Sequence, residues 1–280
     1  MGTDNYYSVK EDVQKYIDGC KTKMNVRTHK VFGRAVLAGM MIAFGASASN
    51  VAAHAVTNVG LSRLVAGCVF PVGLMMIVFV GGELFTGDCM MSMAYMKGRM
   101  SLGSLLRTLL IVYLGNFAGA VLIAFLVAHS GQYDYSAGTL GAYTIKVAAG
   151  KTGLSFIRAL FSGVLCNILV CAAVLMAAAA KDIGGKVLAI FFPILAFVVS
   201  GFEHCVANMY YIPAGIFAAG NPAYVQKAQE LYRLEAEKLA GLNWGNFVAV
   251  NLLPVTIGNI IGGAVMVGGV CFYLHGKAEG

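Results

Sequence analysis

Two ionisable side chains, Glu203 and His204, lie next to each other inside the apolar segment Val187–Phe217. Ionisable groups at membrane depth are energetically costly, so they usually face a cavity or a polar partner. A second apolar segment contains the same Gly-x-Glu interruption, with its carboxylate at Glu83. The two interruptions together predict a polar site inside a membrane, to which both segments contribute.

His204 allows two interpretations. A histidine inside a membrane can simply hydrogen-bond neighbouring helices together. Because His204 follows a glutamate at an interrupted helix, and because imidazole titrates near neutral pH, we favour a role in lining a pore. Thr86 follows the first interruption. A lone threonine usually bonds its own helix backbone, but in an interrupted segment its hydroxyl could donate to a passing solute.

Glu83 and Glu203 are predicted to be structural. A carboxylate can accept hydrogen bonds from the N–H groups that a broken helix leaves without partners. If these carboxylates lined an anion pathway, they would repel the solute. We therefore expect both glutamates to stabilise their loops.

The composition places the chain in a membrane. Hydrophobic residues make up 59% of it and charged residues 12%, with a mean hydropathy of +0.75, whereas soluble domains are about 25% charged. The apolar runs are continuous, which predicts helices and excludes a membrane β-barrel, whose strands alternate in polarity. The net charge of +7 does not indicate nucleic-acid binding, because lysine and arginine gather at segment ends, where they set membrane orientation.

The seven cysteines show neither a disulfide framework nor a metal-binding pattern. Their number is odd, no Cys-x-x-Cys pair occurs, and most lie inside apolar runs, where cysteine behaves as a small hydrophobe. No metal and no other cofactor is predicted.

Six membrane spans are predicted, since a span needs about 20 residues. They are Val31–Val56, Leu64–Met96, Leu105–Val127, Phe156–Ala180, Val187–Phe217 and Phe247–Leu274. The second and fifth are too long for one straight helix and contain the Gly-x-Glu interruptions. Each is predicted to consist of two half-helices joined by a non-helical loop, which must be buried or line a cavity.

The polar N-terminal segment is predicted to lie against the membrane. Ser8 and Glu11 have the spacing of a helix capping box, and apolar residues recur after them at helical spacing. This predicts a cytoplasmic amphipathic helix within residues 1–30 and a channel domain over residues 31–280. The distribution of lysine and arginine among the loops places both termini in the cytoplasm. A further helix is predicted over Pro222–Leu239 in the last external loop.

The chain also repeats itself, over residues of about 31–127 and 156–274. Three motifs recur in the same order: Arg-Ala-x-x-x-Gly at 34–39 and 158–163, Gly-x-Glu at 81–83 and 201–203, and Gly-Asn-x-x-Gly at 115–119 and 258–262. Each repeat has three spans, so the halves cross the membrane in opposite directions, and the site is expected at their interface.

Two lysines share this repeat. Lys23 shortly precedes the first Arg-Ala motif and Lys151 the second. Taken singly, both would be ordinary solvated charges at helix ends. Inversion places one near each mouth of a pore, which favours an anion pathway.

These motifs resemble the signatures of the formate/nitrite transporter family. The resemblance rests on Gly82–Gly87, Gly201–His204 and Pro254–Asn259, and it covers Arg34–Leu274. It implies an all-α integral membrane protein with an aquaporin-like arrangement of six transmembrane helices. It also implies a homopentamer in which each protomer has its own anion pore.

The resemblance assigns roles to further residues. It implies two apolar constrictions, formed by Phe70, Leu74, Leu84, Val170 and Phe197. Between them it implies a central chamber holding His204, Thr86, Asn167 and Asn259. Lys23 and Lys151 would attract anions into the vestibules, with Lys21 as a possible substitute for Lys23. Without the resemblance, the apolar side chains would be assigned to packing and the amides to hydrogen bonds between helices.

The predicted function is transport of small monovalent weak-acid anions, such as formate, nitrite or hydrosulfide, across a bacterial inner membrane. An apolar ring excludes an anion far more strongly than a neutral acid, and His204 could lend a proton midway. An aquaporin-like pore for neutral solutes is the alternative, and the cationic vestibules argue against it. A membrane enzyme with a Glu-His pair is a third possibility, which no catalytic motif supports. The predicted partners are the anion, the lipid bilayer and further copies of this chain, but not nucleic acid.

Overall fold

The computed structural model describes residues 5–24 and 26–276. Within those residues the regular elements are helices, and the one strand-like pairing is an isolated bridge between Tyr6 and Ala180. In this described part of the chain, six helices are long and apolar enough to cross a membrane. The predicted all-α membrane class is therefore confirmed, while residues 1–4 and 277–280 of the predicted termini lie outside the described part.

The membrane-crossing helices correspond in order to the predicted spans, and their bounds agree to within a few residues, except that the second and fifth end at Val80 and Ser200, where the predicted spans continue to Met96 and Phe217. They are α2 (Thr28–Ala53), α3 (Val59–Val69) with α4 (Val72–Val80), α7 (Leu102–Ala128), α9 (Phe156–Ala179), α10 (Ile183–Ser200) and a last helix over Trp244–Gly276. The last helix comprises α14 (Trp244–Asn246), η3 (Phe247–Leu252), α15 (Leu253–Ile260), η4 (Ile261–Gly269) and η5 (Phe272–Gly276), of which the three η segments are π-type.

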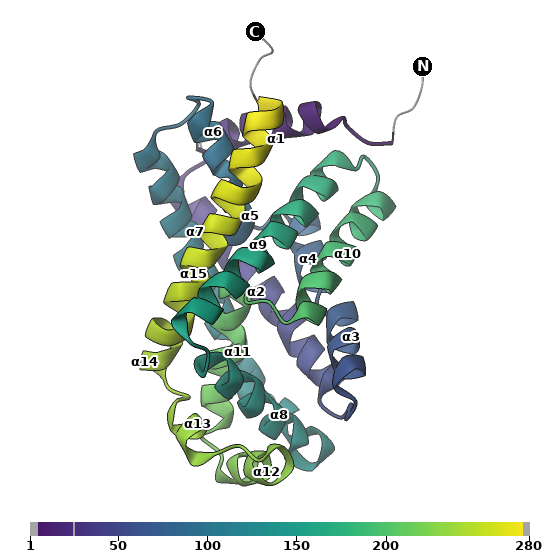
Figure 1. Ribbon diagram of the computed structural model, residues 1–280, viewed down its shortest axis with the longest axis vertical. Coiled ribbons are helices and arrows are strands. Elements are labelled where there is room, and N and C mark those ends of the chain that lie inside the picture. The colour runs from purple at the N-terminus through teal and green to yellow at the C-terminus, as the bar shows by residue number, and fades with distance from the viewer. Residues whose placement is uncertain (1–4, 25, 277–280) are drawn as a thin grey trace.

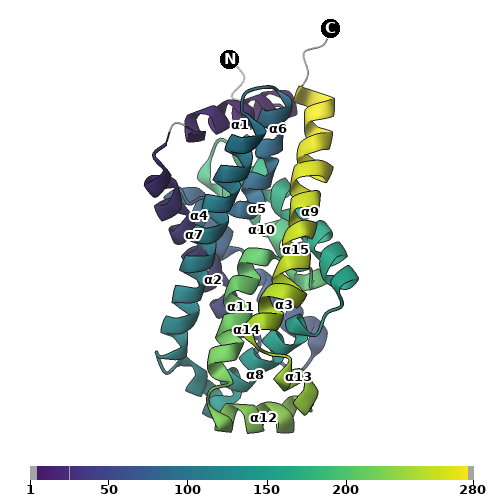
Figure 2. The ribbon, with the colours of Figure 1, turned by 90° about the vertical axis from the view of Figure 1, so that its left-hand side faces the viewer.

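The remaining elements are shorter. Two half-helices lie inside the bundle: α5 (Phe85–Asp88), continued by η1 (Cys89–Met91) and α6 (Ser92–Met96), and α11 (Cys205–Ala218). Outside the spans lie α1 (Val9–Met24), η2 (Gln132–Asp134), α8 (Tyr135–Thr152), α12 (Pro222–Tyr232) and α13 (Ala236–Ala240). In Figures 1 and 2, α1 lies across one end of the bundle beside the yellow C-terminal helix, and α12 lies across the other end.

Non-helical loops interrupt two helices at mid-bundle. Residues 81–84 separate α4 from α5, and residues 201–204 separate α10 from α11. Each preceding helix ends at a glycine in the left-handed region, Gly81 (φ +82°) and Gly201 (φ +72°), a conformation that a side chain would strain. The two Gly-x-Glu motifs therefore mark the ends of two half-helices.

Close backbone contacts between helices follow the same repeat. A Cβ atom added to Gly119 on α7 would overlap the carbonyl oxygen of Val36 on α2. In the second half, a Cβ atom on Gly262 would overlap the carbonyl oxygen of Val164 on α9. The first and third helices of each half thus approach one another through equivalent glycines.

The structure corrects the register of one predicted repeat motif. The N–H group of Glu83 donates to the carbonyl oxygen of Arg34 (3.2 Å), whereas that of Glu203 donates to the carbonyl oxygen of Ser162 (3.4 Å). Ser162 therefore takes the place of Arg34, and the predicted pairing of Arg34 with Arg158 is wrong by one helical turn. The motif was misleading because Arg158 and Ala159 lie one helical turn before Ser162 and Gly163, the residues that take the places of Arg34 and Ala35.

Two further differences concern elements outside the predicted spans. Helix α8 was not predicted, because its composition of alanine, glycine and threonine lacks a clear apolar stripe and its stability depends on packing against α11. The predicted helix Pro222–Leu239 is instead two helices, α12 and α13, which are separated at Arg233 (φ +50°).

Candidate functional site

Two buried asparagines hold the interrupted loops in place. The side-chain oxygen of Asn116 accepts from the N–H of Phe85 (2.9 Å), and that of Asn259 accepts from the N–H of Cys205 (2.9 Å). The amide of Asn116 donates to carbonyl oxygens of Ala35 (2.7 Å) and Glu83 (2.9 Å). Each asparagine thus ties the first residue of a half-helix to its loop.

The predicted chamber amides, Asn259 and Asn167, are bonded to the backbone. The amide of Asn259 donates to carbonyl oxygens of Gly163 (2.8 Å) and Glu203 (3.1 Å). That of Asn167 donates to the carbonyl oxygens of Thr86 (3.1 Å) and Asn259 (2.6 Å). Through these hydrogen bonds, both residues position the loops around the predicted chamber.

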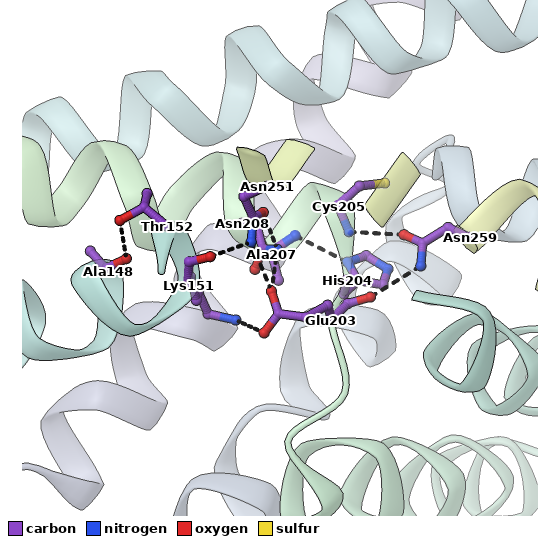
Figure 3. A network of polar contacts seen from close by, with 10 residues as sticks. All are labelled: Ala148, Lys151, Thr152, Glu203, His204, Cys205, Ala207, Asn208, Asn251 and Asn259. Carbon is purple, nitrogen blue, oxygen red and sulfur yellow. Dashed lines mark hydrogen bonds and ion pairs between the residues drawn. The ribbon is translucent and has the colours of Figure 1, made fainter. Parts of the chain in front are cut away.

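Thr86 and His204 meet at the centre of the site. The Thr86 hydroxyl oxygen lies 2.9 Å from Nε2 of His204, and both side chains are buried. His204 is the N-cap of α11, because the N–H of Ala207 donates to Nδ1 (3.0 Å; Figure 3). A backbone N–H can only donate, so Nδ1 accepts and the proton of the neutral ring lies on Nε2. His204 therefore donates to the Thr86 hydroxyl, whose own hydrogen remains available.

The opposite loop has an apolar side chain at the equivalent position. Leu84 is the N-cap of α5 as His204 is the N-cap of α11, and each follows the glutamate of its Gly-x-Glu motif. Leu84 makes no side-chain capping bond. The centre of the site is thus asymmetric, because only the second half contributes a polar cap.

A cavity of about 150 Å³ lies on the α8 side of His204. We name it the α8-side vestibule. Its lining includes Phe70, Phe197, His204 and Lys151. The rings of Phe70 and Phe197 meet edge to face with centroids 5.4 Å apart, and the Phe197 ring lies 6.0 Å from the His204 ring. The two phenylalanines thus give the cavity an apolar lining beside the imidazole.

A second cavity, of about 340 Å³, lies on the α1 side. We name it the α1-side vestibule. Its lining includes Leu74, Leu84, Lys23, Glu83 and Asp88. The predicted constriction residues thus divide between the two vestibules, with the phenylalanines on one side and the leucines on the other. Val170 is buried and lines neither cavity.

On the α8 side, Lys151 forms an ion pair with Glu203. Its Nζ lies 2.9 Å from Oε1, and both side chains are largely buried. The other carboxylate oxygen of Glu203 accepts from amides of Asn208 (2.7 Å) and Asn251 (3.2 Å; Figure 3). The sequence did not predict the roles of these two asparagines. Glu203 therefore stabilises its loop and neutralises the lysine that α8 brings to the mouth.

On the α1 side, Lys23 contacts two carboxylates. Its Nζ forms ion pairs with Glu83 and with Oδ1 of Asp88, the latter at 2.6 Å. The guanidinium of Arg34, which is half-exposed, lies 3.8 Å from Glu83. The hydroxyl of Tyr16 also anchors α1, since it donates to the carbonyl oxygen of Gly87 (2.9 Å). Neither predicted vestibule lysine is an isolated cation.

Asp88 was not predicted as a site residue. The signal lay in the repeat: Asp88 is five residues after Glu83, as Asn208 is five residues after Glu203. A carboxylate stands where the other half has an amide. Among the residues that the structure describes, no group of three or more histidine, cysteine or acidic side chains could hold a metal ion.

Comparison with known proteins identifies relatives over most of the chain. The sequence model of the formate/nitrite transporter family matches residues 10–273. A probable formate transporter of Methanothermobacter thermautotrophicus is 40% identical over 89% of each chain. The formate channel FocA of Haemophilus influenzae is 38% identical over 88% of this chain and 87% of that protein.

Two solved structures share the fold. A pentameric formate channel with formate bound is 32% identical, with a TM-score of 0.78 over 89% of this chain and 98% of that chain. An ion channel of the same family is 27% identical, with a TM-score of 0.79 over 94% of this chain and 98% of that chain.

Proposed function

The chain belongs to the formate/nitrite transporter family, and we propose that it conducts small monovalent weak-acid anions across a membrane, with formate as the principal substrate. One observation carries this proposal: a buried Thr86–His204 pair lies between two vestibules, one lined by Phe70 and Phe197 and the other by Leu74 and Leu84. The names of the formate channels among the relatives and solved structures support the choice of formate.

The proposed path runs from the α8-side vestibule past Phe70 and Phe197 to the Thr86–His204 pair. It then continues past Leu84 and Leu74 into the α1-side vestibule. An apolar constriction offers no hydrogen bonds to replace the hydration of an anion, whereas a neutral acid loses much less on entering it. This favours solutes that can cross each barrier in protonated form and excludes ions that cannot.

At the centre, two features favour an anion. The Thr86 hydroxyl has a hydrogen to donate, because its oxygen already accepts from His204. The N-terminus of α11 also begins beside the imidazole, and helix N-termini carry partial positive charge. A proton relay through the imidazole would require His204 to release Ala207, since a protonated Nδ1 would face another donor.

We place the protein in the bacterial inner membrane with α1 on the cytoplasmic side. The lysine-rich segment around α1 supports this orientation. We further propose a homopentamer with one pore per protomer, which the pentameric solved structure supports. Large apolar side chains exposed along the spans, such as Leu106, Leu110, Phe161 and Phe192, would face lipid or neighbouring protomers.

Flux measurements in liposomes test the function. The purified full-length protein is reconstituted, and uptake of labelled formate is followed with competing nitrite, hydrosulfide or chloride, with and without a pH gradient. Saturable formate uptake, reduced by the weak-acid competitors more than by chloride, is expected. Uptake no faster than in protein-free liposomes would refute the proposal, whereas preference for nitrite or hydrosulfide would refute formate as the principal substrate.

A further inference from the structure

The two vestibules differ at one pair of repeat-related residues, Asp88 and Asn208. On the α8 side, the amide of Asn208 donates to Glu203, so the amide reinforces the Lys151–Glu203 pair without adding charge. On the α1 side, Asp88 places a second carboxylate on Lys23 beside Glu83. One mouth thus joins one ammonium to one carboxylate, and the other joins one ammonium to two.

Asp88 has a hydrogen-bonding capacity that its surroundings leave unused. Its side chain is 8% exposed, Oδ1 contacts Lys23, and Oδ2 has no hydrogen-bond partner among the described residues. The carboxyl group lines the α1-side vestibule. A buried, unpartnered carboxylate oxygen that borders a cavity is a place where a proton can bind with little rearrangement.

The charged and titratable groups around Asp88 come from several elements. Lys23, Cys20 and Tyr16 face it from α1, Glu83 from the loop, Arg34 from α2 through Glu83, Cys89 from the following turn, and Cys171 from α9. Two of these groups are cationic and one is anionic. With Asp88 ionised the charges balance, and with Asp88 protonated the cluster has one net positive charge.

We propose that Asp88 binds a proton from the α1-side solution and that this proton controls how readily anions enter the pore from that side. The proposal rests on the function proposed above. When Asp88 is ionised, Lys23 is neutralised and attracts anions weakly. When Asp88 is protonated, its O–H becomes a neutral donor like the Asn208 amide, and Lys23 with Arg34 leaves a net positive charge facing the incoming anion.

The dependence is expected to be one-sided. The α8-side vestibule has an amide where the α1 side has Asp88. Acidification on the α1 side should therefore promote anion entry from that side beyond its effect on substrate protonation, and acidification on the α8 side should not. In the orientation proposed here, acidification of the cytoplasm would favour anion export.

The test compares wild type with Asp88→Asn in planar bilayers, where the pH of each side is set separately. Formate current entering from the α1 side is measured at low ionic strength, from about pH 8 to about pH 5. The ratio of variant to wild-type current cancels the protonation of formate itself. At alkaline pH this ratio should be roughly threefold to tenfold, because one negative charge has been removed beside the entry path. It should fall towards unity as the α1 side is acidified.

Two variants provide controls. Asp18→Asn removes an exposed carboxylate from α1, the helix that carries Lys23, and its ratio to wild type should show no such pH dependence. Asn208→Asp places a carboxylate in the α8-side vestibule, and it should add a pH dependence of anion entry on that side while the dependence on the α1 side remains. A flat ratio for Asp88→Asn, or an equal response of the wild-type protein to acidification of either side, would overturn the proposal.

A second measurement does not depend on transport. Infrared difference spectra of wild type against Asp88→Asn should show a protonated-carboxyl band that appears as the pH is lowered through the same range. If wild type conducts no anion but the band titrates, the proposed function fails while proton binding at Asp88 stands. If wild type conducts and the band is absent over the range in which the current changes, the inference itself is refuted.

Discussion

The hydroxyl oxygen of Thr86 lies 2.9 Å from Nε2 of His204, although the two residues are 118 positions apart. One follows the loop of the first half and the other ends the loop of the second, so the pair joins the two repeats at the centre of the bundle. The bond from the Ala207 N–H to Nδ1 fixes which nitrogen donates. The contact thus sets both the position and the polarity of the central side chains.

Replacing His204 by asparagine should separate weak-acid transport from passage of other anions. The asparagine oxygen can accept the Ala207 N–H as an N-cap, so α11 should begin normally, but the titrating donor is lost. If His204 relays a proton, formate flux should fall at least about tenfold, while flux of a strong-acid anion such as chloride is retained or rises. Liposome flux of both anions over a pH series measures this.

His204→Phe is the matched variant for that experiment. It fills the space beside Phe197 and provides neither donor nor acceptor, so it should block both anions. Wild-type formate flux with an unaltered pH profile in His204→Asn would eliminate the relay. His204 would then be a hydrogen-bonding residue that positions Thr86.

Removing the charge of Lys151 should destabilise the protein as well as slow transport. Lys151→Met leaves the Glu203 carboxylate buried without its cation, which costs about 3 kcal/mol for a pair of this burial. The double variant Lys151→Met, Glu203→Gln removes both charges and should recover most of that stability. Thermal unfolding of the purified proteins in detergent compares the variants. Equal melting temperatures for wild type, Lys151→Met and the double variant would show that the pair contributes little.

Gly45→Ala should loosen the contact between α2 and the α3–α4 junction. An added Cβ would lie 2.7 Å from the carbonyl oxygen of Phe70, which forces the backbones apart at a cost of about 1–3 kcal/mol. Formate flux should change too, because Phe70 borders the α8-side vestibule. Gly33→Ala on the same helix meets nothing within 4 Å and should stabilise by up to about 1 kcal/mol. Similar melting temperatures for both variants would contradict this account.

Asp12 on α1 should lower stability at neutral pH. Burial raises the pKa of this carboxyl to about 6, although Lys15 and Lys186 oppose the shift, and its Oδ1 has no described hydrogen-bond partner. The folded state therefore holds the proton more tightly than the unfolded state, whose pKa is about 3.9. Stability should fall as the pH rises from about 4 to about 6, by at most about 3 kcal/mol.

Asp12→Asn tests this linkage. The variant should melt at a higher temperature than wild type above about pH 6 and at a similar temperature near pH 4. Asp18→Asn, which changes an exposed carboxylate on the same helix, should match wild type at both pH values. A constant difference between Asp12→Asn and wild type over this range would exclude titration of Asp12 as the cause.

Some features followed directly from the sequence. Each apolar run is continuous in the chain, so it can be recognised from the sequence alone. Such a run must be helical in a membrane because lipid cannot hydrogen-bond open backbone groups. The capping box was also correct: the N–H of Ser8 donates to Glu11 (2.8 Å), since both residues lie within one turn. The Gly-x-Glu motifs marked the helix interruptions because a left-handed glycine ends each preceding helix.

Tertiary structure alone decided which groups face each other. Lys23 and Asp88 are separated by 65 positions, and Lys151 and Glu203 by 52, so no local pattern showed that both lysines are neutralised. The amide of Asn259 donates to the carbonyl oxygens of Gly163, 96 positions away, and of Glu203, 56 positions away, so both of its bonds are made across the chain. Helix α8 likewise depends on packing against α11. Hydropathy and short motifs act along the chain, whereas ion pairs, the histidine tautomer and the repeat register depend on distances that exist only after the helices have packed.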